Sequence, residues 1–136
     1  MAVGDLFNDG HLEAVVENLT GQPMILRPEG GPRHHWISFQ LEGVRSNRLA
    51  LNARIRVTAG GVAQLGEVIS GGSYLSQSDL RLHFGLADHE RADAVTIRWP
   101  DGVTEVLRNL AADRFYAVRE GAGVTGSAPP RSTTGL

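Results

Sequence analysis

The chain has 136 residues, a formal net charge of -2 and no cysteine. This length fits one domain with a short extra segment, and the lack of cysteine excludes disulfides and thiolate metal sites. All 13 basic residues are arginine, but the net charge argues against a nucleic-acid partner, which would require a basic surface. No apolar run approaches the roughly 20 residues that span a membrane, and the first residues do not read as a signal peptide.

Acidic residues are regularly spaced near the start of the chain. Asp5, Asp9 and Glu13 fall at positions 1, 5 and 9 of a loop that has Gly10 at position 6. Calcium requires several hard oxygen ligands, and a glycine here permits the sharp turn that brings them together. Position 3 is Phe7, which supplies no oxygen. The spacing therefore predicts a weak calcium site with four candidate ligands: Asp5, Asp9, His11 and Glu13. The alternative is a turn that serves only the backbone.

Two short apolar runs follow this loop. Residues 12–16 and 23–27 have the pattern of strands, and residues 18–22 between them have the composition of a turn, so a hairpin is predicted at 12–27. Two strands alone are marginally stable in water, so this hairpin must pack against another surface. Residues 28–34 are rich in proline and glycine and are predicted to be a linker.

Residues 35–120 contain about seven short strands joined by turns. In residues 80–84, for example, apolar side chains alternate with Arg81 and His83, and the strand is predicted to stop at Gly85. Such alternation favours antiparallel pairing with one buried face. The predicted fold class is all-β: an antiparallel β-sandwich or barrel of about seven strands, preceded by the hairpin.

Two further elements are predicted near the C-terminal end. Residues 109–113 have the composition of one helical turn, which precedes a last strand at 115–120. Residues 121–136 consist mostly of small residues and proline and have little to bury. They are therefore predicted to be a disordered tail or linker.

Polar side chains on the outward faces of the strands are candidates for ligand binding. Arginine forms bidentate contacts with carboxylates and sugars, and aromatic rings offer flat platforms. The candidate set is Arg54, Arg56, Tyr74, Arg81, His83 and Arg98. If these residues share a face, the chain is a carbohydrate- or protein-binding module. If they do not, they belong to an ordinary solvated sheet surface.

The acidic residues and histidines permit a remote alternative, a glycoside-active enzyme. Paired carboxylates can hydrolyse glycosidic bonds, and an acid–base cluster can move protons. The candidates are Glu67, Asp79, His83, Asp88, His89, Glu90 and Asp93. Adjacent polar residues in a loop are usually only solvated. The sequence also lacks the Gly-x-Ser-x-Gly nucleophile elbow, the His-Glu-x-x-His zinc motif and a phosphate-binding loop. We therefore expect that the protein is not an enzyme.

Several motifs, taken together, resemble a known domain. They are Arg-Ser-Asn-Arg at 45–48, Ala-Arg-Ile-Arg-Val at 53–57, Gly-Gly-Ser-Tyr-Leu-Ser-Gln-Ser at 71–78, His-Phe-Gly-Leu at 83–86 and Trp-Pro-Asp-Gly at 99–102. In this order and spacing they resemble the ASPIC/UnbV domain over residues 43–108 and, with the flanking strands, over 35–120. That domain stands at the C-terminal end of bacterial FG-GAP/VCBS-repeat proteins and of cartilage acidic protein.

Residues 4–27 resemble the last part of an FG-GAP/VCBS β-propeller repeat. The resemblance places Asp5, Asp9 and Glu13 on calcium positions of the repeat. Phe7 departs from the usual Asp or Asn, and Glu13 departs from the usual Asp. The chain is thus divided into a partial repeat at 1–30, an ASPIC/UnbV-like β domain at 35–120 and the tail at 121–136.

The resemblance implies an extracellular or cell-surface module beside a propeller, with a role in adhesion, matrix or surface assembly and no catalytic residues. Its partial repeat is about half of one blade, so its strand edges lack neighbours, and an unpaired edge is a template for pairing. We expect the hairpin to dock on its own domain or on another copy, which would give a homo-oligomer or fibre. Other expected partners are an upstream propeller, a glycan or a matrix protein.

Overall fold

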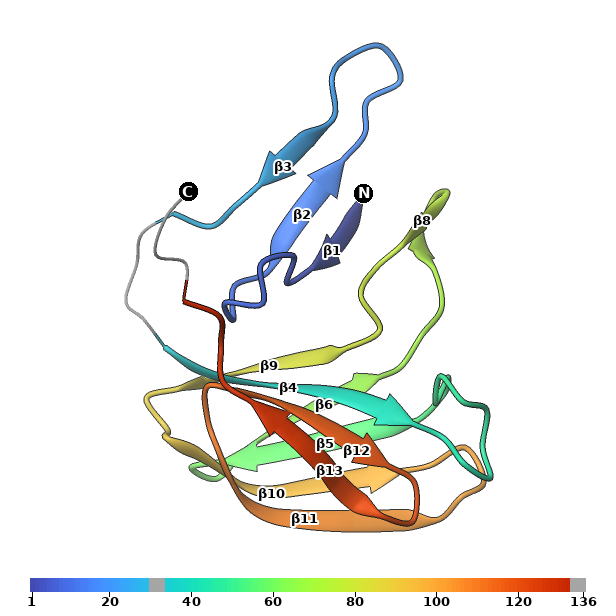
Figure 1. Cartoon of the computed structure of the whole chain (residues 1–136), viewed down its shortest axis with the longest axis vertical. Coiled ribbons are helices and arrows are strands. Elements are labelled where there is room, and N and C mark those ends of the chain that lie inside the picture. The colour runs from blue at the N-terminus through green and yellow to red at the C-terminus, as the bar shows by residue number, and fades with distance from the viewer. Residues whose placement is uncertain (30–33, 133–136) are drawn as a thin grey trace.

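The computed structural model describes residues 1–29 and 34–132. Within these residues the protein has thirteen β-strands and no helix, which confirms the all-β prediction (Figure 1). The described part accordingly contains no helix that is long and apolar enough to cross a membrane. The strands are β1 (Ala2–Gly4), β2 (Glu13–Val16), β3 (Met24–Leu26), β4 (His35–Glu42), β5 (Arg54–Ala59), β6 (Val62–Glu67), β7 (Gly72–Ser73), β8 (Ser76–Gln77), β9 (Leu82–Ala87), β10 (Arg91–Arg98), β11 (Thr104–Ala111), β12 (Arg114–Arg119) and β13 (Gly123–Ala128).

Eight of the strands in the described part form a sandwich of two four-stranded sheets. The β10 sheet has the order β11-β10-β5-β6, and the β4 sheet has the order β13-β12-β4-β9. Their inner faces supply the core, in which Ile37, Phe39, Ile55, Val95 and Ile97 are fully buried. The alternation of apolar and polar residues thus predicted the buried faces correctly. The sheets stay separate, so the fold is the predicted sandwich and not a closed barrel.

One pair of neighbouring strands departs from the antiparallel prediction. β4 and β12 run parallel, from Arg114 beside Ile37 to Arg119 beside Glu42. The connection explains this direction, because β11 belongs to the β10 sheet and β12, which begins three residues after β11 ends, belongs to the β4 sheet. The chain therefore crosses between the sheets and does not return beside the strand it has just left.

Two predictions near the C-terminal end are wrong. Residues 109–111 finish β11, and the chain then crosses to β12 with Asn109 and Asp113 at φ of 57° and 56°, so there is no helical turn here. Residues 123–128 form β13, which pairs antiparallel with β12, although they were predicted to belong to a disordered tail. β13 forms because its backbone pairs with the N–H and C=O groups of β12, and this pairing does not require large apolar side chains. Residues 30–33 of the predicted linker and residues 133–136 of the predicted tail lie outside the described part.

The predicted stop at Gly85 is also wrong, because β9 continues to Ala87. Leu86 is buried and extends the apolar face after Phe84. The register between β4 and β9 shifts between His35 and Trp36, which accommodates the additional length as a bulge.

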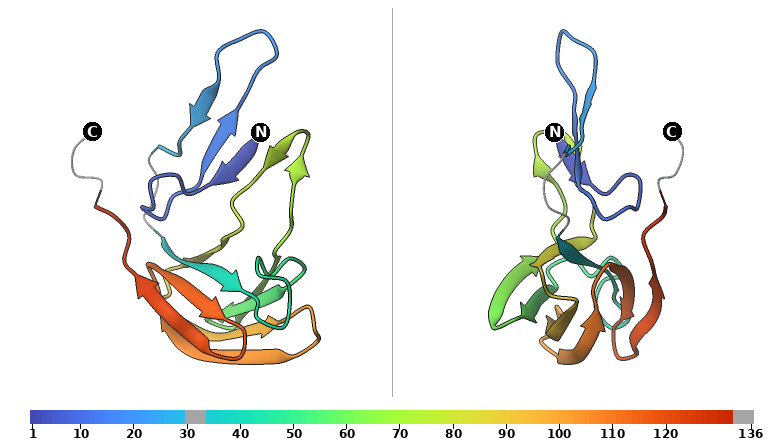
Figure 2. Two further views of the ribbon diagram at one scale, coloured as in Figure 1. Left: turned by 45° about the vertical axis from the view of Figure 1, so that its right-hand side comes forward. Right: turned by 90° about the vertical axis from the view of Figure 1, so that its left-hand side faces the viewer.

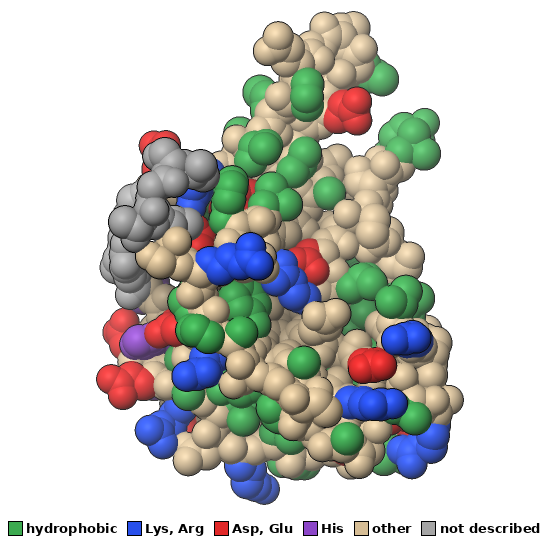
Figure 3. Space-filling view, in the orientation of Figure 1, with side chains coloured by type: hydrophobic (Ala, Val, Ile, Leu, Met, Phe, Trp, Pro, Cys, Tyr) green, Lys and Arg blue, Asp and Glu red, His purple; other side chains and the backbone are tan. Residues whose placement is uncertain are grey.

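Strands β1, β2 and β3 form a separate sheet, which we call the N-terminal sheet (Figures 1 and 2). The predicted hairpin is confirmed as β2 and β3, and β1 adds a strand that was not predicted. Both faces carry apolar residues. Those in register across one face are Val3, Ala14 and Leu26, and those in register across the other are Ala2, Val15 and Ile25. Figure 3 shows hydrophobic side chains gathered over this sheet.

A short ribbon of β7 and β8 projects from the sandwich on the same side as the N-terminal sheet (Figure 2). Its turn carries Tyr74 and Leu75, whose side chains are almost completely exposed. The segment that directly follows the ribbon touches the N-terminal sheet, because the N–H of Val3 donates to the hydroxyl of Ser78 at 3.2 Å and the carbonyl of Val3 accepts from the N–H of Asp79 at 2.9 Å.

Candidate functional site

The loop at residues 5–13 brings the predicted calcium ligands Asp5, Asp9 and Glu13 together. Asp5 is buried, and its carboxylate accepts the N–H groups of Asp9 at 3.1 Å and Gly10 at 2.8 Å. Glu13 is fully buried, and its Oε2 accepts the N–H of Leu6 at 3.0 Å. The carboxylates therefore organise the loop backbone. The fourth predicted ligand, His11, is exposed, although its backbone N–H donates to Asp9.

These groups do not fit a calcium ion as they are arranged. Calcium takes six to eight oxygen ligands at 2.3–2.6 Å, but Phe7 supplies no side-chain oxygen at the third position of the loop and His11 is exposed. Asp9 and Glu13 instead face the guanidinium of Arg27. Across residues 1–29 and 34–132, no group of three or more His, Asp and Glu side chains is arranged to hold a metal ion.

Arg81 links this loop to the sandwich. Its Nη1 donates to the side-chain oxygen of Asn8 at 2.6 Å, and its Nη2 donates to the backbone carbonyl of Asp5 at 2.8 Å. Its Nε donates to Asp79 at 2.7 Å, and its guanidinium lies 5.2 Å from the centre of the Phe115 ring. One of the predicted ligand-binding arginines is thus a cross-link between the N-terminal sheet and the sandwich.

Gly10 marks a close approach of the loop to the sandwich. A Cβ atom at this position would lie 2.1 Å from the indole of Trp36, and the backbone has a φ of 91°. Glycine is therefore required twice, for the left-handed conformation and for the contact. The alternative interpretation, a turn that serves only the backbone, does not include this packing.

His83 lies on the outward face of the β4 sheet, where Trp36 covers it. The two rings stack with centroids 5.4 Å apart, and His83 Nδ1 is buried with no hydrogen-bond partner in the described part. Burial lowers the pKa of His83; nearby His11 and Arg81 lower it as well, and Asp5 acts in the opposite direction. The burial of this ring beside Trp36 thus favours its neutral form.

The remaining predicted arginines lie on the opposite side of the sandwich. Since Ile55 and Ile97 point into the core, Arg54, Arg56 and Arg98 face outward from the β10 sheet. Tyr74 stands apart from both groups, at the tip of the ribbon. The six predicted ligand-binding residues therefore occupy three separate places, and they do not form one face.

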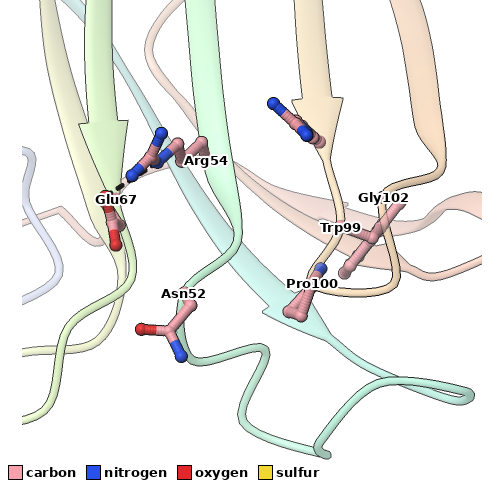
Figure 4. Close-up of a pocket in the computed structure, with 7 residues that line it drawn as sticks. Asn52, Arg54, Glu67, Trp99, Pro100 and Gly102 are labelled. Carbon is pink, nitrogen blue, oxygen red and sulfur yellow. Dashed lines mark hydrogen bonds and ion pairs between the residues drawn. The ribbon is translucent and has the colours of Figure 1, made fainter.

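Arg54 and Arg98 border a pocket of about 410 Å³ at one end of the β10 sheet (Figure 4). They are direct neighbours on adjacent strands, and Nε of Arg54 donates to Glu67 at 2.9 Å. Figure 4 shows this ion pair on one side of the pocket and the turn at 99–102 on the other. The charged residues that line the pocket are two arginines and one glutamate, and this glutamate pairs with Arg54. The lining therefore has a net positive charge, which suits an anionic group.

The carboxylates considered for glycoside chemistry do not converge. Glu67 pairs with Arg54, and Asp79 pairs with Arg81 near the N-terminal sheet. Asp93 accepts the backbone N–H of Gly60 at 3.0 Å. These three carboxylates stand in different parts of the described structure, each engaged with its own partner.

The sequence analysis missed Glu120, the buried carboxylate that organises the loop at 43–48. Its Oε2 accepts the N–H groups of Val44, Arg45 and Ser46 at 2.7, 2.8 and 2.9 Å, and its Oε1 accepts the Ser46 hydroxyl at 3.0 Å. Burial alone would raise the pKa of Glu120, but the hydrogen bonds outweigh it and lower the pKa to about 2. Arg45 also donates to Asp101 at 3.1 Å, so two of the sequence motifs meet here.

The fold and this loop define an all-β sandwich module in which two of the sequence motifs meet beside a buried carboxylate. The sequence model of the family described as ASPIC and UnbV matches residues 43–125, which is more than half of the chain. The protein belongs to this family, as the motifs predicted. A search of the curated proteins finds no match. The predicted FG-GAP/VCBS repeat lies outside the matched residues and stays a prediction.

Proposed function

We propose that this protein is a non-enzymatic, extracellular binding or assembly module that associates with a second copy of itself through the N-terminal sheet. The observation that carries the proposal is the state of β3. Within the described part β3 pairs only with β2, and its residues Met24, Ile25 and Leu26 are 46%, 59% and 53% exposed. An apolar strand with an open edge is a template for another strand.

Both faces of the N-terminal sheet support the same interpretation. Apolar residues on both faces of a sheet are typical of sheets that are covered on both sides. Here the strands of the sheet are only partly buried. A second copy can place its own β3 antiparallel to this β3 about a two-fold axis. This pairing closes the open β3 edge of each copy. The extracellular setting is part of the proposal and is supported by the resemblance of residues 4–27 to a propeller repeat.

Light scattering over a range of protein concentrations tests this proposal. We expect the wild-type protein to approach twice the 14.6 kDa mass of one chain as concentration rises. Ile25→Lys should remain monomeric, because a charge on an edge strand disfavours pairing. Leu65→Lys is the matched control, since Leu65 is 78% exposed on β6, an edge strand of the sandwich, and this variant should dimerise normally. A wild-type monomer at all concentrations would overturn self-association and leave a partner of different sequence.

The pocket beside Arg98 supports a second candidate function, carbohydrate or protein binding. Its specific feature is that Arg98 lies beside Arg54 in the strand register while the pocket has one carboxylate, Glu67, which pairs with Arg54. An acidic sugar such as glucuronate is a suitable probe, because its carboxylate would balance the positive charge. Isothermal titration should show binding that Arg98→Ala weakens at least about tenfold, whereas Arg108→Ala on β11 leaves it unchanged. The absence of saturable binding to the wild-type protein would reject this second candidate.

A further inference from the structure

The guanidinium of Arg27 lies among the carboxylates that the sequence assigned to calcium. Its Nη2 is 2.5 Å from Oδ2 of Asp9, and its Nε is 3.6 Å from Oε1 of Glu13. The strand register explains this position, because Leu26 pairs with Ala14 and the next residue therefore comes beside Glu13. One cation, from the residue that directly follows β3, thus meets two carboxylates of the loop.

The charges of this cluster require such a cation. The side chain of Glu13 is fully buried, and that of Asp9 is 6% exposed. Buried carboxylates are costly unless they are paired. Oε1 of Glu13 has no hydrogen-bond partner in the described part, and its ion-pair partner is Arg27. Without Arg27, none of the ion pairs among residues 1–29 and 34–132 would bring a positive charge to this buried carboxylate.

Phe7 completes the cluster. It occupies the loop position at which a calcium site needs an oxygen ligand, and its ring cannot supply one. The ring instead lies under the guanidinium of Arg27, 4.7 Å from its centroid to Cζ. A cation over an aromatic face is attracted to it. The residue that is unsuitable for calcium is therefore suitable for arginine.

We infer that the guanidinium of Arg27 takes the place of the metal ion in this loop. It is a built-in cation that closes the loop, so that residues 5–13 keep their conformation at any calcium concentration. The loop carries the groups that dock on the sandwich, namely the Asp5 carbonyl and the Asn8 side chain that bind Arg81. The attachment of the N-terminal sheet is thereby independent of calcium, and this inference does not depend on the proposed self-association.

Calcium titration followed by NMR of backbone amides tests the inference on the wild-type protein. Amide signals of residues 5–13 should not shift up to about 10 mM calcium chloride, a concentration above that needed by weak extracellular sites. The melting temperature should also be the same in EDTA and in calcium. Saturable shifts confined to this loop would overturn the inference.

A gain-of-function variant provides the second test. Arg27→Gln combined with Phe7→Asp removes the cation and its aromatic support and adds an oxygen ligand, so the loop should then bind calcium in the micromolar to millimolar range. The double variant should melt at a higher temperature in calcium than in EDTA. Arg56→Gln, on the distant β10 sheet, is the control and should show no calcium effect. A folded double variant that does not bind calcium would contradict the inference, and if it fails to fold, the wild-type titration decides.

Discussion

The sandwich and the N-terminal sheet are built from strands of similar pattern, yet they differ in how their apolar residues are covered. In the sandwich, Ile55 and Ile97 are fully buried because a second sheet lies over them. In the N-terminal sheet, Met24, Ile25 and Leu26 remain about half exposed. The comparison teaches that the apolar residues of a strand indicate a face to be buried. They do not indicate whether the surface that buries it belongs to the same chain.

A matched pair of truncations should give the largest difference between the two regions. Ile55→Ala removes a fully buried side chain from the core, and we expect it to lower the free energy of unfolding by roughly 2–5 kcal/mol. Ile25→Ala removes an exposed side chain and should cost less than about 0.5 kcal/mol in the monomer. Urea denaturation at low protein concentration measures both. Equal losses would mean that the N-terminal sheet has a buried face in the monomer.

Glu120→Gln should produce the next largest effect, and it should be confined to the sandwich. Removing the charge weakens several hydrogen bonds to the 43–48 loop, at a cost of roughly 2 kcal/mol at neutral pH. Because folding lowers the pKa of Glu120 from 4.5 to about 2, its contribution is fully present above pH 4.5 and is lost as pH falls toward 2.

Urea denaturation between pH 2 and pH 7 checks this pH dependence. The difference in stability between the wild-type protein and Glu120→Gln should shrink as the pH is lowered through this window. Glu17→Gln, an exposed position outside the sandwich, should track the wild-type protein throughout. A difference between the wild-type protein and Glu120→Gln that is independent of pH would show that the carboxylate charge is not responsible.

Arg81→Ala should affect global stability less than Glu120→Gln does, and it should act on the junction between the regions. It removes the donors to Asn8 and Asp5, so the N-terminal sheet should open more often. Hydrogen exchange at residues 2–16 should accelerate, while the free energy of unfolding of the sandwich changes by less than about 1 kcal/mol. Arg56→Ala controls for the loss of an arginine. Unchanged exchange in residues 2–16 would show that other contacts hold the sheet.

The features that could be predicted from the sequence are those set by near neighbours in the chain. Alternation with a period of two identified the buried face of β10 and the hairpin of β2 and β3, because pleating is a local property. The motifs at 45–48 and 99–102 identified the family. The parallel pairing of β4 with β12 was not predictable in this way, since it depends on the sheet to which the chain crosses after β11.

The candidate sites were harder to predict because their contacts join distant parts of the sequence. Glu120 meets Val44 and Ser46 across more than seventy residues, and no pattern around Glu120 indicates this. The acidic spacing at 5–13 did predict a cluster of carboxylates. Its cation comes from Arg27, whose contact with that loop depends on the register of the hairpin.

The strand order of the β4 sheet has a mechanical consequence. β4 and β12 are parallel and β13 is antiparallel to β12, so the first residues of β4 and the last residues of β13 lie at the same end of the sheet. A pull applied between residues 35 and 128 would therefore load the hydrogen bonds of these strands one after another, as in unzipping, and would not shear them together. We expect the sandwich to yield at low force when it is pulled at these two points, whatever its resistance to heat or denaturant.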